Sequence, residues 1–239
     1  MLHAVDDASG RVFLRFVPNE NTEEVLKTLK KYVEENGIPH SIYTDKFKVY
    51  YAEDKQTDFQ KAMDKLSIRR IYANSPQAKG RVERGNRTLQ DCLVKEMRLR
   101  GISDIDSANK FLREEFIDYY NNKFSIKDDL PDVHTSSEGI ELENVFCRET
   151  KIQVRNDYTV TLNGKYIQLE KSEVTLPLPK QYVTLRKYLD GSLHIFHNED
   201  ELKFKILNGK PRRKRVKVSW RPAENHPWRN INFGKNRRK

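Results

Sequence analysis

The spacing of apolar residues changes once along the chain, and this change limits the folds that the sequence can adopt. Up to residue 124, short β-branched runs alternate with longer segments whose apolar residues recur every three or four positions, as in strands alternating with helices. From Val145 onward, short alternating runs are separated by turn dipeptides such as Asn163-Gly164. The sequence therefore predicts an α/β unit over residues 1–124, a linker over 125–144 and a small five-stranded β-barrel or sandwich over 145–207.

The remaining segment, residues 208–239, is set apart by its charge. The chain of 239 residues has a net charge of +10, but this tail holds 12 Lys or Arg and one acid, whereas the other 207 residues hold 33 bases and 34 acids. The tail has few apolar residues to bury, so it is either a solvated tail or a contact with the phosphate backbone of a nucleic acid. The second reading is favoured, with the bases Lys210, Arg212, Arg213, Lys214 and Arg215 as candidate DNA-binding residues.

Within the α/β unit, turn and capping residues predict where the elements begin and end. Residues 3–18 have the pattern of two short strands joined by a turn. Helices are expected after Asn21, after Thr57 and from Ser103 to about Asn121, because these Asn, Thr and Ser residues can accept hydrogen bonds from a first helical turn.

Two carboxylates follow two neighbouring predicted strands. Asp45 ends the apolar run at 41–45, and the run at 68–73 leads into a helix that carries Glu83. In α/β sheets, ligands bind at the carboxyl ends of the strands. Two carboxylates there can share a divalent cation such as Mg²⁺ or Mn²⁺, which suits phosphoryl transfer. Asp45 and Glu83 are therefore candidate metal ligands and catalytic residues.

Bases surround Glu83 in the segment SPQAKGRVERGNRTL, residues 75–89. Spacing by four places Lys79, Glu83 and Arg87 on one helix face. Helix statistics alone favour an ordinary solvated face with ion pairs, whereas the pairing with Asp45 favours a phosphate-binding role. The candidate DNA-binding residues of this segment are Lys79, Arg81, Arg84 and Arg87.

The string SPQAKGRVER, preceded by YTD, resembles the end of the catalytic core of DDE transposases and retroviral-type integrases. More closely, DDASGRV, YTDKFKVY and ANSPQAKGRVERGNRTLQDCLVKEMRLRGIS are similar to bacterial insertion-sequence transposases of the ISNCY type, and the likeness extends over almost the whole chain. The resemblance implies an RNase H-like core, a smaller β-rich domain and a metal-dependent enzyme that cleaves and joins DNA. It matches Asp45 and Glu83 to the second and third acids of the catalytic triad, which ligate Mg²⁺ or Mn²⁺.

The same resemblance implies further partners and a departure from the family. The partners are transposon ends and target DNA, bound by a homo-oligomer in the bacterial cytoplasm at the nucleoid. The first catalytic Asp belongs on a strand upstream of the hairpin, and this sequence starts too late to contain it. Asp6 and Asp7 match a turn instead. We therefore expect an N-terminally truncated transposase whose RNase H-like core lacks its first strand, and whose catalysis alone is weak or absent.

Two functions from different classes stay open at this point. One is a DDE-type recombinase core, and the other is a noncatalytic DNA-binding remnant that uses the β-domain and the tail. A third, an RNase H-type nuclease, would share the fold but not the string SPQAKGRVER. Membrane insertion is not indicated, because the longest apolar runs are only a few residues. Cys92 and Cys147 lack metal-ligand spacing, which favours a reducing compartment.

Overall fold

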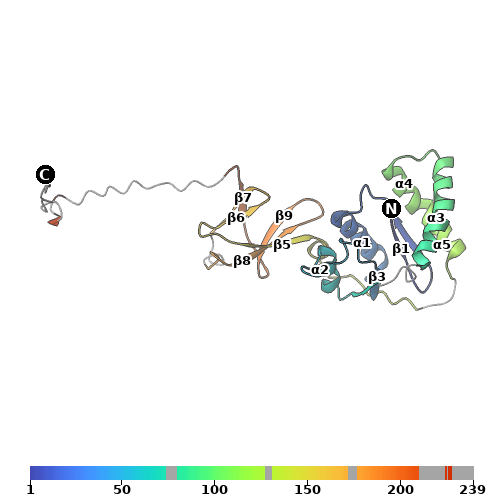
Figure 1. Ribbon diagram of the computed structural model, residues 1–239, viewed down its shortest axis with the longest axis horizontal. Coiled ribbons are helices and arrows are strands. Elements are labelled where there is room, and N and C mark those ends of the chain that lie inside the picture. The colour runs from blue at the N-terminus through green and yellow to red at the C-terminus, as the bar shows by residue number, and fades with distance from the viewer. Residues whose placement is uncertain (74–79, 127–130, 172–176, 210–223, 225, 228–239) are drawn as a thin grey trace, which may run out of the picture.

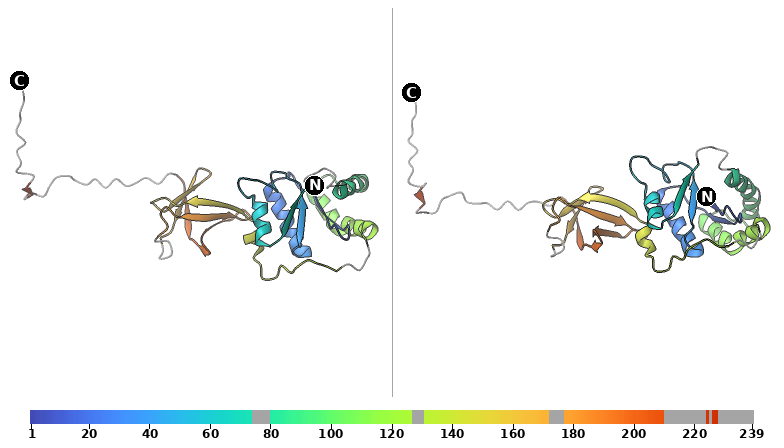
Figure 2. Two further views of the ribbon diagram at one scale, coloured as in Figure 1. Left: turned by 60° about the horizontal axis from the view of Figure 1, so that its bottom comes forward. Right: turned by 90° about the horizontal axis from the view of Figure 1, so that it is seen from below.

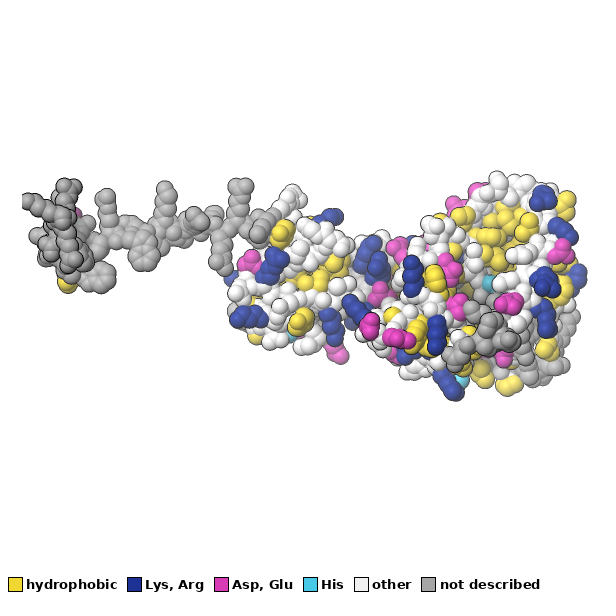
Figure 3. Space-filling view, in the orientation of Figure 1, with side chains coloured by type: hydrophobic (Ala, Val, Ile, Leu, Met, Phe, Trp, Pro, Cys, Tyr) yellow, Lys and Arg dark blue, Asp and Glu magenta, His cyan; other side chains and the backbone are white. Residues whose placement is uncertain are grey.

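The computed structural model describes residues 1–73, 80–126, 131–171, 177–209, 224 and 226–227. An α/β part, residues 1–147, lies at one end, and a β-rich part, residues 148–207, extends from it (Figure 1). Hydrophobic side chains gather over the helical end of the α/β part, whereas basic and acidic side chains are interspersed over the waist between the two parts (Figure 3). None of the helices in the described segments is both long and apolar enough to cross a membrane.

The chain begins with the expected hairpin. Strands β1 (Leu2–Val5) and β2 (Val12–Arg15) pair antiparallel, with Val5 opposite Val12. Asp6 accepts hydrogen bonds from the backbone N–H groups of Ala8 and Ser9 at 3.3 and 3.1 Å. This arrangement explains Asp6 as a turn residue.

A parallel strand pair follows. Helix α1 (Thr22–Asn36) is capped by Asn21, and helix α2 (Asp58–Lys65) begins with a capping box between Thr57 and Gln60. Strands β3 (Ser41–Thr44) and β4 (Arg69–Tyr72) flank α2 and pair in parallel, with Thr44 opposite Tyr72. Both predicted helix starts are therefore confirmed by the capping hydrogen bonds.

Three helices follow β4 within the described residues 80–126. They are α3 (Gly80–Leu99), α4 (Ile105–Phe111) and α5 (Ile117–Phe124), with one π-helical turn, η2 (Leu112–Phe116), joining the last two. The cap of α4 is Asp104, which accepts from the N–H of Ser107 at 2.8 Å, and not the expected Ser103. The helical run that begins with α4 ends with α5 at Phe124, close to the end expected near Asn121.

Two cores hold the α/β part together. One lies around α1 and α2, and the other lies between the β1–β2 hairpin and helices α3–α5 (Figure 2). Leu2 packs into the first core and Val5 into the second, so the hairpin separates them. The β1–β2 and β3–β4 pairs are two separate two-stranded ladders.

The predicted linker is partly packed against the α/β part. Ile38 and Thr135 exchange two backbone hydrogen bonds of 2.8 and 2.9 Å. Tyr32 Oη lies 2.8 Å from His134 Nε2. The short helix α6 (Leu142–Val145) then buries Leu142 and Val145 in the core around α1 and α2.

The described residues of the β-rich part form seven strands where five were expected. One sheet has the order β10-β9-β8-β5, and the other has the order β11-β7-β6. A shared core that includes Val160, Ile167 and Ile195 fills the space between them. The two additional strands are β10, which has two residues, and β11, which has four. The bounds are β5 (Arg148–Gln153), β6 (Thr159–Leu162), β7 (Lys165–Leu169), β8 (Tyr182–Lys187), β9 (Leu193–His197), β10 (Asp200–Glu201) and β11 (Phe204–Leu207).

Candidate functional site

Asp45 lies directly after β3, at the carboxyl end of the parallel pair. Its side chain is half-buried, and its Oδ1 accepts a hydrogen bond from the backbone N–H of Phe47 at 3.1 Å. This bond fixes the turn that follows β3. The carboxylate is therefore held at the edge of the ladder, where the sequence predicted it.

The negative charge of Asp45 acts on a neighbouring tyrosine. Burial raises the pKa of Tyr50, and the charge of Glu20, a hydrogen bond to Glu20 and the charge of Asp45 act in the same direction. Tyr50 donates to Glu20 Oε1 at 3.0 Å. The phenol therefore stays protonated at neutral pH and donates its hydrogen bond to Glu20.

Glu83 lies in the first turn of α3 and is exposed. An acid is favourable there, because the first turn of a helix carries partial positive charge. Arg84 and Arg87 are exposed on the same helix. Lys79 lies outside the described residues, and of Arg81 only its place in α3 is described.

The fold relates the two acids through adjacent strands. Asp45 follows β3 directly, and α3 follows β4, the parallel partner of β3, after residues 74–79, which lie outside the described part. Across the described ranges, no group of three or more His, Cys, Asp or Glu side chains is placed to hold a metal ion. Asp45 and Glu83 therefore belong to no such group within that part of the chain.

The β1–β2 hairpin packs against α3, the helix that carries Glu83. His3 Nδ1 lies 2.8 Å from Asn86 Oδ1, and a Cβ atom on Gly85 would come within 2.9 Å of His3 Cε1. Burial lowers the pKa of His3, although the hydrogen bond with Asn86 opposes this effect. A neutral His3 therefore packs closely on α3 one turn beyond Glu83.

Lys210, Arg212, Arg213, Lys214 and Arg215 all lie outside the described residues.

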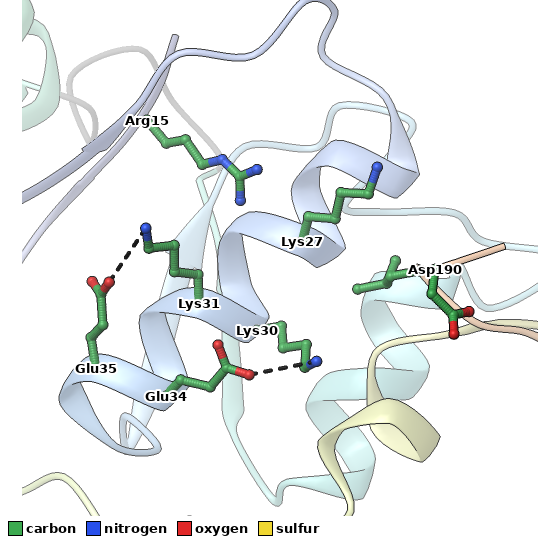
Figure 4. Close-up of a pocket in the computed structure, with 8 residues that line it drawn as sticks. Arg15, Lys27, Lys30, Lys31, Glu34, Glu35 and Asp190 are labelled. Atoms are coloured by element: carbon green, nitrogen blue, oxygen red, sulfur yellow. Dashed lines mark ion pairs between the residues drawn. The ribbon is translucent and has the colours of Figure 1, made fainter. Parts of the chain in front are cut away.

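A separate depression of about 420 Å³ lies on α1, beside the β8–β9 turn (Figure 4). It is lined by Arg15 and three lysines, but Lys30 pairs with Glu34 and Lys31 with Glu35, both at 3.5 Å. The acids largely balance the bases, so this depression is a weak candidate for binding an anion.

Sequence reasoning missed an exposed apolar surface next to Asp45. Tyr43 and Ile71 lie opposite each other in the β3–β4 register, and their exposed fractions are 45% and 37%. Phe47, two residues after Asp45, is 40% exposed. Side-chain alternation along residues 41–45 could have predicted the face on which Tyr43 lies, but it does not predict whether that face is covered.

Comparison with known proteins supports a transposase family for this chain. No protein-family model matches the sequence. The chain is 35% identical over 87% of its length to a protein of Sinorhizobium fredii named as the transposase y4bF, and it covers 48% of that protein. It is 27% identical over 96% of its length to the transposase for insertion sequence IS1202 of Streptococcus pneumoniae, of which it covers 54%. The chain thus spans about half the length of these curated relatives.

Proposed function

We propose that this chain is part of a transposase and acts on DNA through a metal site formed by Asp45 and Glu83. The observation that carries the proposal is the position of Asp45 at the carboxyl end of β3, with Glu83 on the helix that follows the adjacent parallel strand. The similarity to proteins named transposases supports the same function. The proposed reaction is metal-dependent DNA strand cleavage and transfer at phosphodiester bonds.

The two side chains fit the proposed ion. Mg²⁺ prefers oxygen ligands and is commonly bound by one or two carboxylates together with water and substrate phosphates. When bound, such an ion stabilises the charges on the attacking and leaving oxygens. The hydrogen bond from the N–H of Phe47 to Asp45 Oδ1 orients the Asp45 carboxylate before any ion arrives.

The bases near Glu83 are proposed to bind phosphates. Arg84 and Arg87 are exposed on the helix of Glu83, and Lys79 and Arg81 belong to the same stretch of sequence. Guanidinium groups can bind phosphate oxygens through two parallel hydrogen bonds. The tail bases 210–215 are proposed to add backbone contacts that carry no sequence preference.

We also propose that the α/β part is an RNase H-like core. The β1–β2 hairpin and the parallel β3–β4 pair are separate ladders, as expected if a strand between them is lacking. A homo-oligomer on paired DNA ends is part of the same proposal.

We expect DNA binding that is strong at low salt and strand cleavage that is weak or absent. Two carboxylates without a third ligand in the described part of the chain hold a divalent ion loosely. Each phosphate contact lowers the logarithm of the binding constant by about 0.9 per tenfold rise in salt. Binding should be followed by fluorescence anisotropy at several salt concentrations, and cleavage by nicking of a supercoiled plasmid with Mn²⁺.

Three variants distinguish the hypothesis of a recombinase from that of a noncatalytic DNA-binding remnant. Any nicking should disappear in Asp45→Asn and in Glu83→Gln but persist in Asp91→Asn, an exposed acid on the same helix that pairs with Lys95. No nicking by the parent chain, with DNA binding retained in both site variants, would favour the noncatalytic remnant. Failure to bind DNA at low salt would contradict both.

A further inference from the structure

The turn after β3 holds an exposed aromatic ring on a fixed backbone. The N–H of Phe47 donates to Asp45, and the carbonyl of Phe47 accepts from the N–H groups of Tyr50 and Tyr51 at 2.8 and 3.0 Å. Yet 40% of Phe47 remains exposed. An apolar ring held in this way is presented to the solvent by the turn and is not on a freely moving loop.

The outer face of the β3–β4 pair, which ends at the turn that holds Phe47, is also exposed. Tyr43 and Ile71 are opposite each other in register and exposed, and Arg69 shares their face because side chains alternate along β4. The opposite face is covered by α2, where Arg70 donates to the carbonyl of Gln60 at 2.7 Å. The pair is therefore packed against α2 on one side and partly exposed on the other.

Positive charges flank the exposed rings. Lys46 and Lys48 are both exposed, and their ammonium groups lie 5.5 Å from the Tyr51 ring centroid and 6.0 Å from that of Phe47. Neither lysine pairs with an acid in the part of the chain that the structure describes. Lys46 and Lys48 follow Asp45 in the same turn, and Arg69 adds a third base on the outer face at the other end of the ladder, opposite Ser41. A bound cation would offset the charge of Asp45.

We propose that Tyr43, Phe47 and Ile71 form a stacking surface for unpaired bases of DNA, with Lys46 and Lys48 binding the adjacent phosphates. Aromatic rings between lysines are the combination that single-stranded nucleic acids require, because bases stack on rings while the backbone needs positive charge. This proposal rests on the proposed function, since it places frayed nucleotides of a DNA end next to Asp45. It commits the surface to DNA and not to a protein partner.

The test compares two DNA ligands in EDTA, so that metal binding at Asp45 and Glu83 does not enter. One is a blunt duplex and the other is the same duplex with an unpaired 3′ extension, and both are titrated by fluorescence anisotropy. The parent chain should prefer the extended duplex. Phe47→Ala should weaken binding of the extended duplex by roughly five- to 100-fold and leave the blunt duplex almost unchanged, because stacking acts only on unpaired bases.

Matched variants separate stacking from general damage. Phe47→Trp should retain the preference, and Tyr182→Ala, which removes a 64% exposed aromatic on the β-rich part, should not alter it. Replacing Lys46 and Lys48 by Gln should reduce the salt slope for the extension by about 1.4, the contribution of two single-strand phosphates. The variants' folding is checked by circular dichroism.

Two results would overturn the stacking surface. One is equal binding of blunt and extended duplexes by the parent chain. The other is self-association of the chain, seen as a concentration dependence in sedimentation, that Phe47→Ala abolishes while the preference for the extended duplex stays unchanged. That result would show that the surface binds a second copy of the chain. Neither result bears on the metal site, because Asp45 and Glu83 are tested separately by metal binding.

Discussion

Replacing Glu149 by alanine is expected to lower the free energy of unfolding by about 3 kcal/mol, because it leaves two partly buried cations without their carboxylate. Glu149 Oε1 lies 2.6 Å from Lys65 Nζ and 2.9 Å from Arg186 Nε. Lys65 comes from α2 and Arg186 from β8, so this carboxylate joins the α/β part to the β-rich part. Chemical denaturation followed by circular dichroism measures the loss.

The surroundings of Glu149 explain why the loss is large. Its side chain is only 16% exposed, and Arg186 also lies 3.2 Å from the side-chain oxygen of Asn144. Lys65 additionally donates to the carbonyl of Asn144 at 2.7 Å. Removing the carboxylate therefore leaves donors that cannot all turn to water.

The same ion pairs make stability depend on pH. Burial raises the pKa of Glu149, but the hydrogen bonds and charges of Lys65 and Arg186 outweigh burial and lower it below the ordinary 4.5. A lowered carboxyl pKa gives stability that is present above the ordinary value and is lost as pH falls through the lowered one. Glu149→Gln should therefore lose less stability than the parent chain between neutral pH and acid.

An exposed pair provides the control for Glu149. Glu170 and Lys205 are 3.0 Å apart, with exposed side-chain fractions of 41% and 75%. Such a surface pair contributes about 0 to 1 kcal/mol, so Glu170→Ala should change little. Equal losses for Glu149→Ala and Glu170→Ala would contradict the role assigned to Glu149.

The second large effect is expected at Phe146, between α6 and β5. Phe146 is fully buried in the core around α1 and α2. Replacing it by alanine should lower the free energy of unfolding by about 4 kcal/mol, because the removed ring leaves a cavity that rigid neighbours cannot fill. Phe146→Leu retains most of the volume and should lose less than about 1.5 kcal/mol.

Phe124 offers a comparison for Phe146. Its side chain is 44% exposed at the end of α5, so Phe124→Ala should cost much less. The same midpoint of thermal unfolding for Phe146→Ala and Phe124→Ala would contradict the stabilising role of Phe146 in the core around α1 and α2.

Much of the local structure of the α/β part could be predicted from short stretches of sequence. Asn21 and Thr57 cap helices because their side chains bond to N–H groups three residues away. The position of Asp45 after a strand followed from the short β-branched run before it. These features depend on neighbours in sequence, so the pattern alone predicts them.

The features that sequence missed depend on distant partners. Glu149 meets Lys65 across 84 positions and Arg186 across 37, and no local pattern predicts such contacts. Strand β10 was missed because it has only two residues. Strand β11 was missed because its identity as a strand depends on pairing with β7, which is distant in sequence. The exposure of Tyr43 and Phe47 depends on what covers their face, which periodicity does not specify.

The central claim is that Asp45 and Glu83 share a divalent ion. The most direct test is Mn²⁺ binding to the whole chain, measured from the paramagnetic resonance signal of free Mn²⁺. We expect a weak Mn²⁺ site in the parent chain that is lost in Asp45→Asn and in Glu83→Gln and retained in Asp91→Asn. Mn²⁺ binding that is absent from the parent chain, or that is unchanged in either site variant, would contradict it.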